Sequence, residues 1–187
     1  MPKLWNDTIE EHRRTVHAAI LDAAAQLVAL HGLASVTMTR IAQSAGIGRA
    51  TLYKYFPDVE AVLIAWHERH ITRHLHRLTT VGVEAGDPGQ RLHAALYTYA
   101  SIQREHGRHP LAALLHRGPH VVEARQRLRA FLADLLTEAV AADRVRDDVP
   151  PAELAAYCLH ALDAAAELST EAAVGRLVTT TLAGLRP

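Results

Sequence analysis

The sequence predicts an all-α protein of about nine helices, divided into a small N-terminal domain and a larger C-terminal domain. Apolar residues make up 49% of its 187 residues, and many of them are alanine and leucine, which favour helices. Apolar side chains recur at helical spacing along most of the chain, and glycine and proline separate these segments. We place the two domains at residues 10–57 and 58–187.

Composition and simple motifs exclude several classes of protein. Basic and acidic residues number 20 each, so net charge alone does not indicate a nucleic-acid partner. No stretch of about 18 apolar residues could cross a membrane, the first residues lack the apolar core of a signal peptide, and one cysteine cannot form an internal disulfide. We expect a cytoplasmic protein. Without a GxSxG, HExxH, CxxC or glycine-rich phosphate motif, we expect neither catalysis nor a cofactor.

The first helix is expected over about residues 10–31, after an irregular stretch at residues 1–9. Its apolar residues lie on one side of the helix, which indicates a face that covers a core. These inward positions are Ile20, Ala23, Ala24, Leu27 and Val28.

Residues 37–56 predict two short helices joined by a tight turn. Thr37 is placed to cap the first helix, because its hydroxyl can accept from a backbone N–H two or three residues later. Gly46 ends that helix, since glycine adopts a positive φ without steric cost. Ile47 fills the turn, and Gly48 allows the second helix to begin at once. The inner faces are small and apolar: Ile41, Ala42, Ala45, Leu52 and Phe56.

The second of these helices leaves an outer surface suited to DNA. No aspartate or glutamate occurs between Ala23 and Pro57. A surface without acidic side chains does not repel the negatively charged phosphates of DNA. A polar helix braced by another across a glycine turn fits the major groove. The alternative is a small solvated face. The cations of this stretch are Arg40, Arg49 and Lys54, and the outer residues are Arg49, Ala50, Thr51, Tyr53, Lys54 and Tyr55.

The motif Ile41-Ala42-x-x-Ala45-Gly46-Ile47, followed by Thr51-Leu52-Tyr53-x-Tyr55-Phe56, resembles the DNA-binding domain of TetR-type transcriptional regulators. The upstream segment Ile20-Leu21-Asp22-Ala23-Ala24-x-x-Leu27 is similar to the first helix of that family. The resemblance covers about residues 15–65. It implies a three-helix, helix-turn-helix domain on a larger helical domain that binds a ligand and dimerises. Such a protein would repress transcription from a palindromic operator as a homodimer and leave the operator when a small molecule binds.

The resemblance also implies roles for individual residues. Thr37 and Thr51 would contact phosphates, and Tyr53 and Tyr55 would pack along the sugar-phosphate backbone. Lys54 could serve the backbone or a base. The residues nearest base edges would be Thr39, Arg40, Arg49 and Ala50, with Gly48 beside them at the start of the helix. The family usually carries lysine where this chain has Val59, so we expect one phosphate contact to be missing.

Six helices are expected in the second domain, and the first of them should join the two domains. Asp58 is placed to cap this joining helix. Two prolines suit the first turn of the eighth helix. The six helices are expected at about residues 58–83, 88–106, 110–118, 120–142, from 150 onward, and 170–185.

A ligand cavity is expected among the fourth to eighth helices. The mixture of apolar residues, tyrosine and histidine there favours a mid-sized amphiphilic compound. Aromatic residues at helical spacing also suit an ordinary core, which remains the alternative. The candidate lining residues are Trp66, His70, Leu96, Tyr97, Tyr99, Leu114, Leu115, Phe131 and Tyr157.

Two stripes of residues on the last two helices suit either the core of this chain or an interface with a second copy. A two-fold DNA reader needs a dimer to hold its reading helices about 34–36 Å apart. The family resemblance implies that these helices pair in a four-helix bundle, so we assign the stripes to a dimer interface. They are Leu154, Ala155, Leu159, Leu162 and Ala166, and Val174, Leu177, Val178, Thr181 and Leu182.

Histidine is frequent, with 13 residues. His67, His70 and His74 share one helix face at a spacing that could bind Zn²⁺ or Ni²⁺. Arginines are interleaved and no carboxylate or cysteine is placed as a further ligand, so we expect no metal. A metal-responsive regulator remains the alternative function. Cys158 falls in the first stripe, as either a buried small hydrophobic residue or a redox-sensitive thiol.

Overall fold

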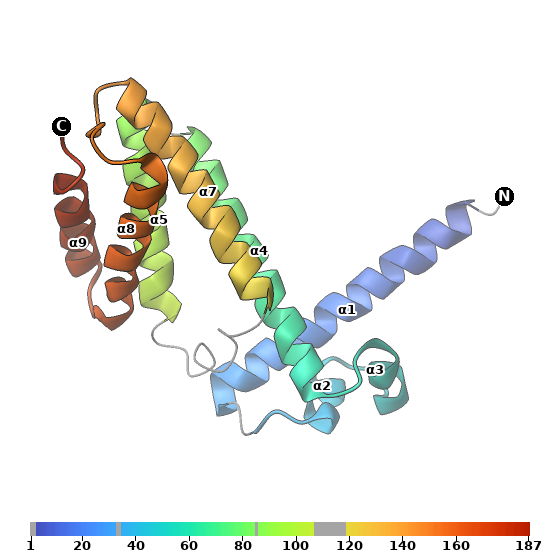
Figure 1. The fold of residues 1–187 in the computed structure, drawn as a ribbon. Coiled ribbons are helices and arrows are strands. Elements are labelled where there is room, and N and C mark those ends of the chain that lie inside the picture. Colours follow the sequence, from blue (N-terminus) through green and yellow to red (C-terminus); the bar gives the residue numbers. More distant parts are fainter. Residues whose placement is uncertain (1–2, 33–34, 85, 107–118) are drawn as a thin grey trace. The chain divides into compact units, whose positions relative to one another are not determined.

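The computed structural model describes residues 3–32, 35–84, 86–106 and 119–187 (Figure 1). These residues form helices and no strand, as the sequence predicts. None of their helices is both apolar enough and long enough to pass through a membrane. The elements are α1 (Lys3–His31), α2 (Met38–Ser44), α3 (Arg49–Tyr55), α4 (Val59–Glu84), α5 (Pro88–His106), α7 (Pro119–Ala141), α8 (Pro151–Asp163), η2 (Ala164–Glu167) and α9 (Glu171–Ala183).

The chain folds as two compact units, Met1–His70 and Ile71–Pro187, and α4 contributes to both. The sequence places the domain boundary just before α4. Unit 1 instead continues to His70, and it includes the buried side chains of Val62 and Leu63 in the first turns of α4. The two units are described separately below.

Unit 1 is built on the contact of α1 with α2 and of α2 with α3. Ile20, Ile41 and Leu52 are each 0% exposed and form its centre. The start of α4 is capped as expected, because Asp58 Oδ1 accepts a hydrogen bond from the Ala61 N–H at 2.8 Å.

Arg69 fixes the next turns of α4 against α1. Its Nη2 donates to Asp22 Oδ1 at 2.5 Å, and its Nη1 reaches the Ala18 carbonyl oxygen at 3.5 Å. Two contacts from one guanidinium hold its plane in a single orientation. The first part of α4 is therefore tied to α1 inside unit 1.

The start of α1 differs from the prediction. The helix begins at Lys3, so the expectation of an irregular stretch up to residue 9 is wrong for the described residues. No glycine or proline lies between Pro2 and Gly32, and therefore no residue of the chain interrupts the helix once its second half is packed. Gly32, at φ +74°, ends it. Ile9 is 48% exposed, so this early part is helical without being buried.

Unit 2 is arranged around α5, which contacts α7, α8, η2 and α9 (Figure 1). Leu96, Leu132, Leu162 and Val178 are 0% exposed, one from each of four helices. Burial of that many apolar side chains is the main term that holds such a bundle together. The short helix expected over residues 110–118 lies outside the described residues.

The helix ends in unit 2 follow local rules. Asp87 Oδ1 accepts from the Gly89 and Gln90 N–H groups at 2.8 and 3.1 Å at the start of α5. Thr170 Oγ1 accepts from the Ala173 N–H at 3.2 Å at the start of α9. α8 begins with Pro151, whose fixed φ suits the first turn. These ends lie within a few residues of the predicted ones.

Candidate DNA interface

The turn between α2 and α3 has the geometry that its sequence predicts. Thr37 caps α2, because its Oγ1 accepts from the Arg40 N–H at 3.3 Å. Gly46 has φ +68° and donates to the Gln43 carbonyl at 3.2 Å, while the Ile47 N–H donates to the Ala42 carbonyl at 3.0 Å. This pair of bonds is a Schellman ending, which satisfies the last carbonyls of the helix. The turn therefore fixes where α3 begins.

A single fully buried side chain anchors α3. Leu52 is 0% exposed, and Phe56, which follows the helix, is 6% exposed. The remaining surface of this seven-residue helix is available to a partner. Arg49, Ala50, Tyr53 and Lys54 are exposed, whereas Thr51 and Tyr55 are partly buried at its sides; the predicted outer residues thus occupy the outer and flanking faces.

Arg49 and Tyr53 form a pair on the exposed face of α3. The Arg49 guanidinium carbon lies 5.9 Å from the centre of the Tyr53 ring, and Nη2 lies 3.5 Å from the Tyr53 hydroxyl oxygen. A cation over a ring face is attracted by the negative charge of that face. The pair restricts the Arg49 side chain before any partner binds. The contact between these two side chains is not evident from the sequence alone.

Arg40 is held more tightly than the sequence suggests. Its Nη1 donates to the Ser35 carbonyl oxygen at 3.1 Å, so part of the guanidinium supports the entry to α2. Thr37 and Thr39 beside it are exposed. Arg40 therefore keeps only some of its donors for a partner.

Charge along this surface has one sign. The described residues from 35 to 57 carry three cations and no acidic side chain. Val59, where the family usually has lysine, is partly buried at the first position of α4 and adds no charge. The surface is therefore weakly basic, and its positive charge comes from α2 and α3 alone.

The structure divides the predicted ligand-lining residues between the two units. Trp66 and His70 belong to unit 1, where their ring centres lie 5.4 Å apart. In unit 2, Leu96 and Tyr99 are core residues, and Tyr157 is 47% exposed. Tyr97 and Phe131 are partly buried, and Leu114 and Leu115 lie outside the described residues.

Unit 2 contains a polar cluster that the sequence alone does not predict. Asp163 Oδ1 accepts from the Tyr99 hydroxyl at 2.6 Å and from Gln103 Nε2 at 2.5 Å, and Oδ2 accepts from Arg125 Nη2 at 2.9 Å. Burial, followed by the hydrogen bond to Asp163, raises the pKa of the Tyr99 hydroxyl well above its ordinary value. One carboxylate thus joins α5, α7 and α8.

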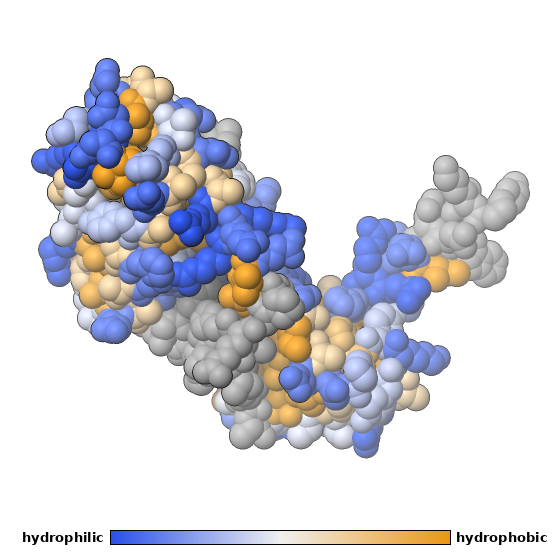
Figure 2. Space-filling view, in the orientation of Figure 1, coloured by the Kyte–Doolittle hydropathy of each residue, from blue (hydrophilic) through white to orange (hydrophobic). Residues whose placement is uncertain are grey.

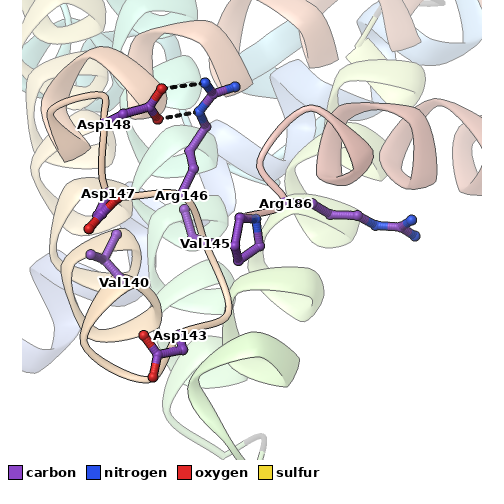
Figure 3. Close-up of a pocket in the computed structure, with 8 residues that line it drawn as sticks. Val140, Asp143, Val145, Arg146, Asp147, Asp148 and Arg186 are labelled. Atoms are coloured by element: carbon purple, nitrogen blue, oxygen red, sulfur yellow. Dashed lines mark hydrogen bonds and ion pairs between the residues drawn. The ribbon is translucent and has the colours of Figure 1, made fainter.

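A surface pocket of about 500 Å³ lies at the end of α7 and beside the chain's last residues (Figure 3). Arg146 and Asp148 form a two-bond ion pair there, with both N–O distances at 2.5 Å, and the hydrogen bond from Arg146 lowers the pKa of Asp148. The Arg146 N–H also donates to the Leu185 carbonyl at 2.9 Å. None of the predicted ligand-lining residues lines this pocket.

The predicted dimer stripes lie mainly inside unit 2. Leu154, Ala155, Leu159, Leu162, Val174, Val178 and Thr181 are at most 5% exposed in a single chain. Ala166, Leu177 and Leu182 are partly buried. Buried side chains offer no surface to a partner, so a second copy would have to meet the other faces of α8 and α9.

Cys158 and the histidines also have defined surroundings. Cys158 is 0% exposed, and burial raises the pKa of its thiol to about 12, so the reactive thiolate is disfavoured. That supports its interpretation as a small hydrophobic residue. Among the described residues, no group of three or more His, Cys, Asp or Glu side chains is placed to hold a metal ion.

Two family models match the sequence. One, described as "Bacterial regulatory proteins, tetR family", matches residues 20–65. The other, described as "Transcriptional regulator SbtR-like, C-terminal domain", matches residues 92–187. The first spans the two short helices and their Schellman turn, and the second spans most of unit 2.

Curated relatives agree with these matches. An uncharacterized HTH-type transcriptional regulator of Mycobacterium tuberculosis is 41% identical over 96 residues, which are 50% of this chain and 47% of that protein. The alignment thus spans about half the length of this relative. The HTH-type transcriptional repressor LfrR of Mycolicibacterium smegmatis is 31% identical over 145 residues, which are 74% of this chain and 71% of that protein.

Solved structures share the fold. A TetR/AcrR-family regulator from Thermobifida fusca superposes with a TM-score of 0.77 at 24% identity, covering 91% of this chain and 98% of that one. FadR of Bacillus subtilis in complex with stearoyl-CoA gives 0.71 at 17% identity, covering 90% and 99%. AibR in complex with isovaleryl coenzyme A and operator DNA gives 0.64 at 18% identity, covering 92% and 98%. The family models and the LfrR match together show that this chain belongs to the TetR family of bacterial regulatory proteins.

Proposed function

We propose that the protein is a transcriptional repressor that binds a palindromic DNA operator as a homodimer and is released by a small molecule. The observation that supports this proposal best is the exposed outer face of α3. The helix is held by Leu52, its outer face is exposed, and that face presents the Arg49–Tyr53 pair on a surface without acidic side chains. A pre-ordered cation on a short exposed helix suits the reading of base edges in the major groove.

Each exposed residue of this surface has a role in the proposal. Arg49 binds the O6 and N7 atoms of a guanine, and the Ala50 methyl meets a thymine methyl. Lys54 contacts a phosphate or a base. Thr39 and Arg40 lie near base edges, with Gly48 beside them at the start of α3. Thr37 and Thr51 contact phosphates, and Tyr53 and Tyr55 pack along the sugar-phosphate backbone.

The proposed homodimer uses the exposed faces of α8 and α9. These faces carry Tyr157 and small residues such as Ala172 and Thr179. Gly175, in the middle of α9, is partly buried, and a Cβ atom added there would meet no atom within 4 Å. Glycine weakens a helix interior by about 1 kcal/mol relative to alanine, so its place here suits the close approach of a partner helix.

The proposed small molecule binds in unit 2, where Tyr97 and Phe131 pack against the core that includes Tyr99, the tyrosine bonded to Asp163. The FadR structure holds stearoyl-CoA and the AibR structure holds isovaleryl coenzyme A. Acyl-CoA thioesters are therefore the first compounds to test. A ligand can shift the protein away from DNA only by as much as it prefers the released state.

The metal-responsive alternative has weaker support. The histidines on which it depends lie on α4, but the residues that the structure describes gather no group of three metal-ligating side chains. Stoichiometric metal in protein purified without a histidine tag would revive this alternative.

The test is a fluorescence-anisotropy titration with duplexes selected from a random library and with DNA from around the protein's own coding locus. Arg49→Ala should weaken binding to the selected site by about 1–3 kcal/mol and leave binding to unrelated DNA nearly unchanged. Arg127→Ala is the matched control, because Arg127 is a surface arginine on α7 paired with Glu123. Equal loss on both kinds of DNA would reduce Arg49 to a phosphate contact, and no selected site at all would reject the proposal.

A further inference from the structure

The first half of α1 extends beyond the core of unit 1. From residue 9 onward, the first buried side chain along this helix is Ile20, and residues 9–15 are exposed. We call residues 3–17 the overhang. At 1.5 Å per residue the overhang is about 20 Å long. A helix of this length is only marginally stable in water by itself, so it would gain from a partner.

The inner face of α1 continues along the overhang. Ile9, Arg13 and His17 follow one another at four-residue spacing and lead into Ile20 and Ala24, which are buried. Residues at this spacing share one side of a helix. One face of α1 therefore covers the core in the second half of the helix, and the same face is exposed in the overhang.

His17 shows where this face lies relative to α3. Its ring centre is 5.1 Å from that of Phe56, the residue directly after α3. Figure 1 shows the overhang leaving unit 1 on the side where α3 lies. Arg13 is one helical turn further out from His17 on the same face, and it therefore lies beyond the end of the reading helix.

We propose that the overhang binds the duplex next to the operator half-site, with Arg13 on a phosphate of the DNA backbone. This inference rests on the proposed function, because it requires α3 to be seated on DNA. The overhang is long enough to follow about six base pairs of a duplex. It extends the footprint of the protein without adding a base contact.

The surroundings of Arg13 favour DNA over a protein partner for this face of the overhang. No hydrogen bond or ion pair joins Arg13 to another residue whose side chain the structure describes. Among residues 9–17, Ile9 is the one large exposed apolar side chain, and Figure 2 shows a small hydrophobic spot among hydrophilic residues on this part of α1. Protein interfaces have apolar centres depleted of charge, whereas an exposed arginine without an ion pair to a described side chain suits a phosphate.

The charged residues next to Arg13 limit the width of the surface that can contact DNA. Arg14 points along a different side, where its Nε reaches the Glu10 carbonyl oxygen at 3.5 Å. Glu10 flanks the face of Arg13, and Glu11 lies on the opposite side of the helix by helical spacing. The contact with DNA is therefore narrow, and Arg13 is its main cation.

The experiment uses the full chain and two duplexes: the selected operator alone, and the same operator with about six further base pairs of unrelated sequence at each end. Wild type should bind the long duplex more tightly. Arg13→Ala should remove this gain and lower the salt slope on the long duplex by about 1.8, the value for one phosphate contact from each of the two protomers, while leaving the short duplex unaffected. Arg14→Ala, with the same loss of charge on the same helix, should keep most of the gain.

Amide hydrogen exchange gives a second readout. Exchange over residues 3–15 should slow when the long duplex is added, and not when the short one is. Equal wild-type binding to both duplexes would overturn the inference and leave the proposed function intact. Absence of binding to either duplex would overturn both. Slowing that follows protein concentration without DNA would show that a second copy covers the overhang, which also overturns the inference.

Discussion

The helix pairs α2–α3 and α8–α9 each present a surface to a proposed partner, but they are held in the protein by different means. α3 contributes Leu52 as its one buried side chain and leaves its polar residues outside. α8 buries five side chains, from Leu154 to Leu162, and α9 buries three. The proposed reading helix is thus attached to its core by one side chain, whereas the helices of the proposed dimer interface supply many side chains to the core of their own chain.

The largest effect should come from removing the single anchor of α3. Leu52→Ala should destabilise unit 1 by about 2–5 kcal/mol, because it deletes a fully buried side chain that its surroundings cannot replace. Leu30→Ala is the control, since Leu30 is 75% exposed and its loss should change stability by less than about 0.5 kcal/mol. Urea unfolding followed by circular dichroism measures both, and similar losses would mean that α3 is held by other contacts.

The next test concerns the outer face of α9. Gly175→Trp should abolish or greatly weaken dimerisation, because a large side chain would stand between the two helices of the proposed bundle. Gly175→Ala should raise the stability of a monomeric helix by about 1 kcal/mol, since space for its Cβ is open. Sedimentation equilibrium reports the association constant. If Gly175→Trp dimerises like wild type, the interface lies elsewhere.

A smaller, pH-dependent effect should come from the buried face of α8. The thiol of Cys158 ionises at its ordinary pKa of 9.0 when unfolded and at about 12 when folded, so the folded state resists ionisation. The protonated Cys158 thiol contributes fully to the free energy of unfolding below pH 9, and this contribution is lost as the pH rises toward 12. Wild type should therefore lose up to about 1.4 kcal/mol more per pH unit in this range than Cys158→Ala. Parallel slopes in urea unfolding would show that the thiol ionises equally in both states.

The smallest effect should come from the exposed pair on α3. Tyr53→Phe keeps the ring under Arg49 and should weaken binding modestly on every DNA sequence, through loss of one hydroxyl contact. Tyr53→Ala also removes the ring. Its effect on the free energy of DNA binding and that of Arg49→Ala should depart from additivity by about 0.5–1 kcal/mol in the double variant. Anisotropy titrations of the single and double variants measure this coupling. An effect of Tyr53→Phe limited to one base position would assign the hydroxyl to a base.

The sequence predicted α2 and α3 closely because their limits depend on neighbouring residues. Thr37 caps within three residues, Gly46 ends the helix where it stands, and the spacing of Leu52 and Phe56 identifies the inner face. The start of α1 was missed for the complementary reason. No local signal separates a buried helix from its exposed continuation, since both have the same backbone and the same lack of glycine and proline.

Contacts between distant residues were less predictable. Periodicity identified the apolar faces of α8 and α9 but could not say what covers them, and the structure covers Leu159 and Val178 within one chain. The cluster at Asp163 joins residues 60 or more positions apart for Tyr99 and Gln103, and no local pattern announces such a contact. The roles of the DNA-facing residues and the ligand-lining residues stay predictions.

The burial of the Cys158 thiol has a practical consequence for measuring conformational change with a site-specific label. The chain has one cysteine, and in the folded protein it is out of reach of maleimide and similar reagents. A second cysteine introduced at an exposed position such as Ala50 could therefore be labelled selectively. Cys158 would not have to be replaced, so no cavity would be left in the core. A spin label or fluorophore placed there would report the distance between the two copies of α3 in the proposed dimer as compounds are added.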